Sequence, residues 1–358
     1  MHPFRVFISY SHEDRKLAVQ VNDALRGMKL EPVWDKDIRP GTPFSDAIKG
    51  LIANAHLFMP LISENSQHRP WVHQETGYAM AINIPVLPVA FGNLPGEMIS
   101  QLQAISVALK AADEFDEADL TAQLNGINIE QLVLSPPASS VAIVEVADYP
   151  EERTEMMARY ANRVMERGSY GRLRQRGALS SFSIPNRVLS DPIWKLREGS
   201  SPRSQFYRNL QRNERNALEQ HARQSGCSLM LDPEIDMAKM SKNGPTVMRA
   251  RLSSLLEFLA SMPDEKVQVV IRRRTQEGNV TILGDWFVSE SQALRRGEGY
   301  RQTVFSWHAP TVLRELRKFD QEFEEYNRQS GLEPNASRRA AIARIEEVIS
   351  GLPEGDSA

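Results

Sequence analysis

Cysteine is nearly absent from this sequence, in which Cys227 is the only one. A lone thiol excludes an intrachain disulfide and a cysteine-rich metal cluster, and it fits a reducing compartment such as the cytoplasm. The sequence also lacks histidines and cysteines at metal-ligand spacing and a glycine-rich phosphate loop. We therefore expect no bound metal and no resident cofactor.

Long hydrophobic runs are lacking as well. The longest, such as Pro85 to Phe91, fall far short of the about 20 apolar residues that cross a bilayer. The first residues show no basic segment followed by an apolar one, so we expect no signal peptide, no membrane partner and a cytoplasmic location. Hydrophobic residues at 41% and charged residues at 25% are typical of globular protein, and 358 residues allow two or three domains.

The net charge of −3 hides an uneven distribution. Residues 1–150 carry 10 Lys/Arg against 18 Asp/Glu, whereas residues 151–226 carry 15 against 8, and nearly all of these 15 are arginine. Such a basic segment can bind anions, including nucleic acid. Alternatively, its arginines solvate helices or pair with the acidic N-terminal part, and we favour this second interpretation.

Strand-like and helix-like segments alternate over the first 91 residues. Runs of β-branched and aromatic residues predict strands, and apolar stripes at helical spacing predict helices. The strands are expected at 4–10, 32–34, 56–62 and 85–91, and the helices from Ser11, over 44–54 and from Trp71. Ser11 or Asp14 is expected to cap the first helix. The pattern predicts an α/β fold, with a flavodoxin-like parallel sheet and helices on both faces over residues 1–135.

Polar and aromatic side chains follow several of these strands. Ser9 and Tyr10 end the first strand, Trp34 ends the second and Asp35 follows it, and the segment from Trp71 to Glu75 comes after the third. Sites in parallel sheets form at the carboxyl ends of the strands. We expect these side chains to converge on one edge of the sheet.

Three segments, in this order and at this spacing, resemble the Toll/interleukin-1 receptor (TIR) domain, in particular its bacterial NAD-cleaving type. Phe7-Ile8-Ser9-Tyr10-Ser11 resembles the first box of the family, residues 35–41 its interaction loop, and Ile62-Ser63 with Trp71 and Glu75 its third box. The match covers about 130 residues and leaves the C-terminal region unmatched. One departure is Arg69, which stands where the family usually has a small residue.

The resemblance implies that Glu75 is the catalytic residue of an NAD+ glycohydrolase. Breaking the bond between nicotinamide and ribose gives the anomeric carbon oxocarbenium character, and nicotinamide leaves as a neutral base. One carboxylate beside the ribose can therefore suffice, and a position at the start of a helix favours its ionised form. Ser9, Tyr10, Trp34, Asp35 and Trp71 are expected to bind the substrate, and Asp37, Ile38, Pro40 and Gly41 to mediate assembly of TIR domains.

Simpler interpretations of these residues remain open. A Trp and a Glu four residues apart are often a core anchor and a solvated face. Asp35 and Asp37 are also typical turn residues, and Ser9 lacks the histidine and aspartate that would make it a nucleophile. Many TIR domains are adaptors without catalysis.

The remaining residues predict a different kind of domain. The segment 136–140 is rich in proline and serine and predicts a linker, followed by a helix that Asp148 and Pro150 open and that runs to about Gly168. Residues 168–205 show weak periodicity and predict a long irregular, arginine-rich segment. Residues 206–358 predict a mixed α+β domain, with a helix over 248–259, strands at 267–271, 280–283, 286–288 and 303–307, a hairpin turn at 276–279, and helices over 310–328 and 337–350.

The C-terminal domain carries no recognisable chemistry. The segments 282–287 and 305–308, with Phe319-Asp320, faintly resemble the tail of phospholipase-D-like folds, but the paired His-x-Lys signature of those enzymes is missing. An inactive sensor or scaffold version of that fold stays open. Cys227 is most simply a small buried hydrophobic residue.

Two functions from different classes follow. The first is a TIR NAD+ nucleosidase in bacterial antiphage signalling, which self-associates through its TIR domains and is controlled by an unknown ligand or protein at its C-terminal domain. Its products would be ADP-ribose or cyclic ADP-ribose. The second is a non-catalytic TIR adaptor.

Overall fold

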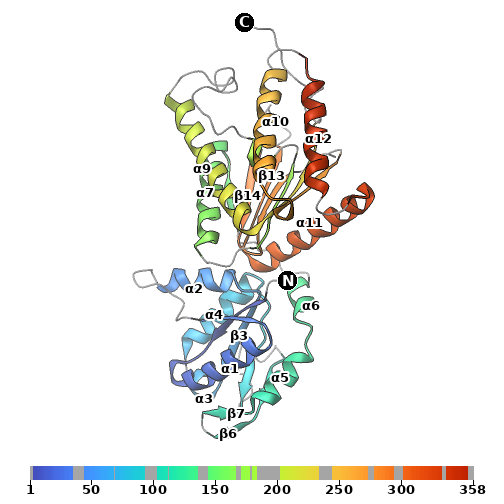
Figure 1. The fold of residues 1–358 in the computed structure, drawn as a ribbon. Helices are drawn as coiled ribbons and strands as arrows, with labels where there is room; N and C mark the ends of the chain where they lie inside the picture. Colours follow the sequence, from blue (N-terminus) through green and yellow to red (C-terminus); the bar gives the residue numbers. More distant parts are fainter. Residues whose placement is uncertain are drawn as a thin grey trace. The chain divides into compact units, whose positions relative to one another are not determined.

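The structure is a computed structural model. It describes residues 3–34, 44–67, 69–92, 103–111, 113–135, 144–166, 171–177, 180–183, 202–233, 244–272, 278–293, 301–332 and 336–353. The chain divides into two compact units. Unit 1 comprises Met1–Val144 and Trp307–Arg314, and unit 2 comprises Glu145–Ser306 and Glu315–Ala358 (Figure 1).

Unit 1 contains a five-stranded sheet in the order β2-β1-β3-β4-β5, in which every paired strand is parallel. The strands are β1 (Arg5–Ser9), β2 (Glu31–Val33), β3 (Leu57–Ile62), β4 (Val89–Phe91) and β5 (Ile105–Val107), and a small hairpin is made by β6 (Leu109–Ala111) and β7 (Glu114–Phe115). The helices are η1 (His12–Asp14), α1 (Arg15–Gly27), α2 (Phe44–Ala53), α3 (Glu64–Gln67), α4 (Pro70–Ala81), α5 (Glu117–Asn125) and α6 (Ile129–Leu134).

The alternation of side chains along β1 divides the core of unit 1 in two. Val6 and Ile8 pack with the apolar stripes of α1 and α5, while Phe7 packs with residues of α2 and α4. Phe7 also stacks on Phe58 of the neighbouring β3, with ring centroids 5.7 Å apart. The flavodoxin-like parallel sheet with helices on both faces is therefore confirmed.

Two local expectations for unit 1 were wrong. The strand expected over 85–91 contains only β4, with an isolated bridge at Val86, because Pro85 and Pro88 have no amide hydrogen for a ladder. Neither Ser11 nor Asp14 caps a helix with its side chain. The Asp14 carboxylate instead accepts hydrogen bonds from Ser63 Oγ (2.6 Å) and Asn65 Nδ2 (2.7 Å).

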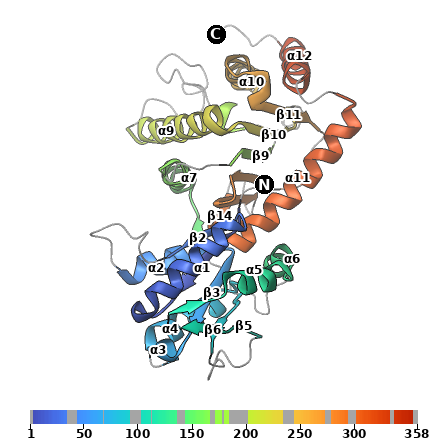
Figure 2. The same ribbon diagram turned by 60° about the horizontal axis from the view of Figure 1, so that its bottom comes forward.

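Unit 2 contains a seven-stranded mixed sheet in the order β11-β10-β9-β12-β13-β14-β8. Its strands are β8 (Glu145–Ala147), β9 (Leu173–Gly177), β10 (Cys227–Leu231), β11 (Val267–Ile271), β12 (Asn279–Leu283), β13 (Phe287–Ala293) and β14 (Arg301–Ser306). Its helices are α7 (Pro150–Met165), η4 (Ser181–Ser183), α9 (Pro202–Ser225), α10 (Gly244–Ser261), η6 (Asp264–Lys266), α12 (Ser337–Ser350) and α11 (Ala309–Ser330) from Glu315 onward. Both ribbon views show α7 beside α9 and α10 beside α12 (Figure 2).

The irregular segment expected over 168–205 contains β9, a central strand of this sheet. The sequence did not predict this strand because its alternating arginines are charged, and charged residues are rarely found in a buried strand. Arg174 makes a bidentate pair with Asp320, and Arg176 contacts Glu322, so both charges are matched by α11. The expected cap of α7 was also wrong, since Asp148 accepts a hydrogen bond from Gln302 and Tyr149 is the N-cap residue.

Several described arginines of the basic segment 151–226 pair with acids of their own unit. Arg153 contacts Glu214, and Arg215 and Arg223 contact Glu219. Across the described residues, no helix combines the length and the apolar character that a bilayer crossing needs. The expected linker at 136–140 lies outside the described residues, as do Gln276 and Glu277 of the hairpin turn at 276–279.

Candidate active site

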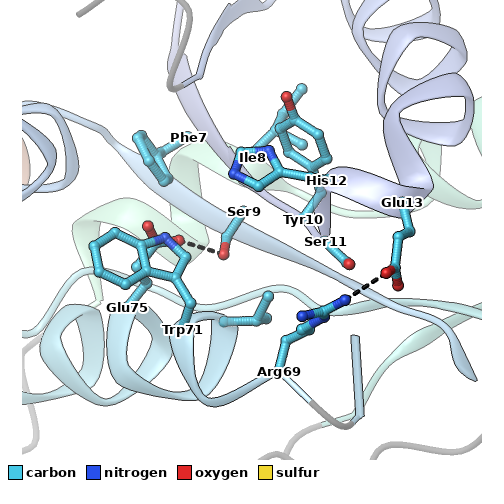
Figure 3. A pocket seen from close by; sticks show the side chains of 11 residues that line it. Phe7, Ile8, Ser9, Tyr10, Ser11, His12, Glu13, Arg69, Trp71 and Glu75 are labelled. Carbon is cyan, nitrogen blue, oxygen red and sulfur yellow. Dashed lines mark hydrogen bonds and ion pairs between the residues drawn. The ribbon is translucent and has the colours of Figure 1, made fainter. Parts of the chain in front are cut away.

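A cavity of about 390 Å³ opens beside the carboxyl end of β1 and the first turns of α4 (Figure 3). It is lined by Phe7, Ile8, Ser9, Tyr10, Ser11, His12, Glu13, Arg69, Trp71, Val72 and Glu75. The volume falls within the range of about 300–1,000 Å³ that is typical of small-molecule sites. Sequence segments some 60 residues apart thus meet at the edge of the sheet where a parallel fold forms its site.

The local sequence explains how α4 presents its side chains to this cavity. Arg69 is the extended N-cap residue, and Pro70 starts the helix at a position where its missing amide hydrogen has no cost. Trp71 and Glu75 stand one helical turn apart and therefore share a face of α4. Ser9 follows Phe7 on the side of β1 that faces α2 and α4, which brings it to the same place.

Glu75 is a buried carboxylate within the cavity wall. Its side chain is only 6% exposed, and Ser9 Oγ donates a hydrogen bond of 2.5 Å to its Oε2 atom. Glu75 is the sixth residue of α4. The expected support from the helix dipole is therefore weak, because that effect fades beyond the first turn. The hydroxyl of Ser9 provides a direct stabilising contact instead.

Trp71 lines the cavity and lies close to Glu75 in Figure 3. Its side chain is 38% exposed, which argues against a pure core anchor. An exposed indole face at a pocket is suited to stacking on a planar ring.

Tyr10 lines the cavity and is buried, with its ring 6.1 Å from that of Trp34 and 6.2 Å from that of His12. Trp34 itself is not among the lining residues. It packs against the core formed with α1, and its ring contacts that of Tyr10. The other predicted site residues, Asp35, Asp37, Ile38, Pro40 and Gly41, lie outside the described residues.

Arg69, Ser11 and Glu13 are among the lining residues that were not predicted as site residues. Arg69 forms an ion pair with Glu13, and these side chains are 53% and 51% exposed. Ser11 is buried at 4% exposure, and its hydroxyl has no hydrogen-bond partner among the described residues. The sequence signalled Arg69 only as a departure from a small residue, while Ser11 and Glu13 resembled parts of a helix start.

The described residues contain no group of three or more His, Cys, Asp or Glu side chains suited to a metal ion. The cavity is lined by two carboxylates, one guanidinium, one imidazole, hydroxyls and aromatic rings.

The fold and site together define a flavodoxin-like α/β domain with a carboxylate pocket at the carboxyl edge of its sheet. Residues 6–124 match the family model of the TIR domain. Unit 1 therefore contains a TIR domain, as the three sequence segments predicted, while the C-terminal region is unmatched.

No curated protein matches this sequence. The solved structure of the CMP N-glycosidase BcmB from Clostridium botulinum is 13% identical, with 34% of this chain and 99% of that chain covered and a TM-score of 0.26. The solved structure of TrmBL2, an archaeal chromatin protein with a novel mode of DNA binding, is 12% identical, with 58% and 63% covered and a TM-score of 0.30. Likenesses this low carry no argument about function.

Proposed function

We propose that unit 1 is an NAD+ nucleosidase and that Glu75 is its catalytic residue. The observation that carries the proposal is a buried carboxylate held by Ser9 inside a cavity of substrate size, in a TIR domain. The TIR family includes NAD-cleaving members, and in these the glutamate four residues after the tryptophan serves the reaction.

In the proposed reaction, the bond between the ribose C1′ and the nicotinamide nitrogen breaks, and its electron pair leaves with neutral nicotinamide. Glu75 stabilises the positive charge that develops on the ribose, because an opposite charge acts strongly in a largely water-excluded site. Water then bonds to C1′ and releases a proton, which gives ADP-ribose. Attack by an atom of the adenine ring instead of water would give cyclic ADP-ribose.

Trp71 and Ser9 have supporting roles in this proposal. The exposed face of Trp71 would stack on the nicotinamide ring, and the hydrogen bond from Ser9 would fix the Glu75 carboxylate toward the ribose. Tyr10 would close the cavity wall. Asp35, and the loop residues expected to mediate assembly, would complete the site when TIR domains self-associate.

Unit 2 would regulate this activity, because an uncontrolled NAD+ nucleosidase depletes its own cell. A role in bacterial antiphage signalling fits such regulation, with an activating ligand or protein acting on unit 2. Nucleic acid is the less favoured activator, since described arginines of the basic segment pair with acids of unit 2.

The test is nicotinamide release from NAD+ by the concentrated full chain, compared with Glu75→Gln and with Glu64→Gln as a matched control. Glu64 is an exposed residue of α3 and does not line the cavity. We expect release by the wild type and by Glu64→Gln, and loss of at least about 100-fold in Glu75→Gln. Equal release by all three, or none by the wild type at any concentration or with activating lysate, would favour the adaptor function.

A further inference from the structure

The cavity has a second polar end, separate from Glu75. Figure 3 shows Glu75, Ser9 and Trp71 toward one side of the view, and Ser11, Glu13 and Arg69 toward the other. Ser11 stands two residues beyond Ser9 along an extended chain, and Arg69 two residues before Trp71. Ser11 and Arg69 therefore each stand two residues away from Ser9 and Trp71, the residues that support the proposed reaction.

The Ser11 hydroxyl is one indication that this end receives a ligand. It is buried at 4% exposure, lines the cavity and has no hydrogen-bond partner among the described residues. A buried hydroxyl without a partner is costly, so such groups usually meet water or a ligand. The hydroxyl is free to donate a hydrogen bond to an anionic oxygen.

The charges at this end give a second indication. Glu13 and Glu75 are carboxylates in the lining, and Arg69 is its one guanidinium among the residues described there. A ligand with two negative charges would be repelled by both carboxylates unless Arg69 turned toward it. The Arg69–Glu13 pair is about half exposed, and exposed ion pairs contribute little free energy. Moving Arg69 from Glu13 to the ligand therefore costs little free energy.

We propose that Ser11 and Arg69 form the subsite for the diphosphate of the dinucleotide substrate, and that the diphosphate displaces Glu13 from Arg69. A guanidinium binds phosphate oxygens in a bidentate manner, and a serine hydroxyl donates to them. This inference rests on the proposed function for its substrate. It adds a specificity role for Arg69, which stands where the family usually has a small residue. Arg69 would make the site prefer a ligand with a diphosphate over a nucleoside.

The two members of the ion pair then have opposite effects. Arg69→Ala removes the cation that the diphosphate contacts and weakens binding. Glu13→Gln removes the competing carboxylate and strengthens binding. A merely structural ion pair predicts the same direction for both changes, so the sign of the Glu13→Gln effect separates the two roles.

The experiment measures equilibrium binding of ADP-ribose and of nicotinamide riboside to the full chain by calorimetry. ADP-ribose carries the diphosphate, and nicotinamide riboside lacks it. We expect Arg69→Ala to weaken ADP-ribose binding by about 10-fold or more and Ser11→Ala by about 3-fold, with nicotinamide riboside changed by less than about 2-fold. Glu13→Gln is expected to strengthen ADP-ribose binding by about 2- to 5-fold.

Matched controls come from the exposed pair Lys16–Asp113 of the same unit, which does not line the cavity. Lys16→Ala and Asp113→Asn change the charge of unit 1 as Arg69→Ala and Glu13→Gln do, and we expect both to leave ADP-ribose binding unchanged. Effects of equal size from these controls would assign the result to net charge and overturn the subsite.

The remaining outcomes separate this inference from the proposed function. Equal weakening for both ligands in Arg69→Ala, weaker binding in Glu13→Gln, or no binding of ADP-ribose to the wild type would each overturn the subsite, even if nicotinamide is released. The expected binding pattern without any release of nicotinamide by the wild type would instead uphold the subsite and reject the nucleosidase.

Discussion

The hydroxyl of Ser9 donates a 2.5 Å hydrogen bond to Oε2 of Glu75 across 66 residues of sequence. The contact joins the last residue of β1 to the second turn of α4, so the carboxylate is held by the sheet as well as by its own helix. Hydrogen bonds to ionised groups are among the stronger ones, at roughly 1.5–3 kcal/mol.

Ser9→Ala should therefore lower the rate of nicotinamide release by about 10-fold or more, with little change in KM. The hydroxyl acts through Glu75 and does not bind the remote parts of the dinucleotide, so the effect belongs to kcat. Ser9→Thr keeps a hydroxyl at the same place and should restore most of the rate. A Ser9→Ala chain with the wild-type kcat, or with a loss confined to KM, would contradict this positioning role.

The buried imidazole of His308 gives unit 1 a sensitivity to acid. Burial lowers the pKa of His308 from its usual 6.5 to about 4, and its Nδ1 atom pairs with Thr311 Oγ1 at 2.8 Å. The unfolded chain binds a proton near pH 6.5 and the folded chain does so only near pH 4. Stability is therefore complete above pH 6.5 and falls as the pH drops from 6.5 to 4, by at most about 3 kcal/mol.

Thermal unfolding between pH 7.5 and 4.5 tests this prediction. The wild-type Tm should fall on acidification, whereas His308→Asn should have a lower Tm at pH 7.5 but a flatter dependence on pH. His12 is an exposed residue of the same unit, and His12→Asn is the matched control that should keep the wild-type slope. Identical slopes in all three chains would rule out His308 as the source.

Parts of this molecule could be predicted from the sequence because their signal is local. The run over 56–62 is apolar at successive positions, and β3 lies there. Trp71 and Glu75 are four residues apart, so they share a face wherever α4 begins. The hydroxyl of Ser11, which is unpartnered among the described residues, and the pairing of Arg69 with Glu13 depend instead on where β1 and α4 meet, which no local pattern encodes.

Strand β9 shows the same limit for the fold. In the sequence, Arg174 and Arg176 resemble part of a solvated segment. In the structure they pair with acids of α11 that lie 146 residues later in the chain. The same holds for Asp14, whose partners are Ser63, directly after β3, and Asn65 of α3. In each case a charge that the sequence assigns to solvent or to a cap is satisfied by a distant partner.

Glu322 is the acid on which two buried arginines of unit 2 converge. Its Oε2 atom lies 2.6 Å from Arg176 Nη1, and its Oε1 atom 3.1 Å from Arg272 Nη2. Glu322→Gln leaves two largely desolvated guanidinium groups with a neutral partner. We expect it to destabilise unit 2 by about 3–5 kcal/mol, because removing one partner of a buried pair leaves its charge uncompensated.

The matched control is Glu347→Gln, which breaks an exposed pair with Arg344 on α12 and should change stability by less than about 1 kcal/mol. Hydrogen exchange of β9 and β11 is the suitable measurement, because it reports on this sheet without requiring two-state unfolding of the whole chain. Equal protection of these strands in both variants would show that Glu322 has no special role.

Substitutions of Trp71 distinguish a role in substrate binding from a role in core packing. With 38% of its side chain exposed, Trp71→Ala should cost less than about 2 kcal/mol of stability, compared with about 3–5 kcal/mol for the fully buried Phe58→Ala on the same side of the sheet. If its indole stacks on the nicotinamide ring, KM for NAD+ should rise by about 10-fold in Trp71→Ala and by much less in Trp71→Phe. Steady-state nicotinamide release gives KM, and thermal unfolding gives the stability, for Trp71→Ala, Trp71→Phe and Phe58→Ala beside the wild type. A large loss of Tm with an unchanged KM would make Trp71 a core anchor, because stacking on a substrate ring has no effect on the stability of the ligand-free chain.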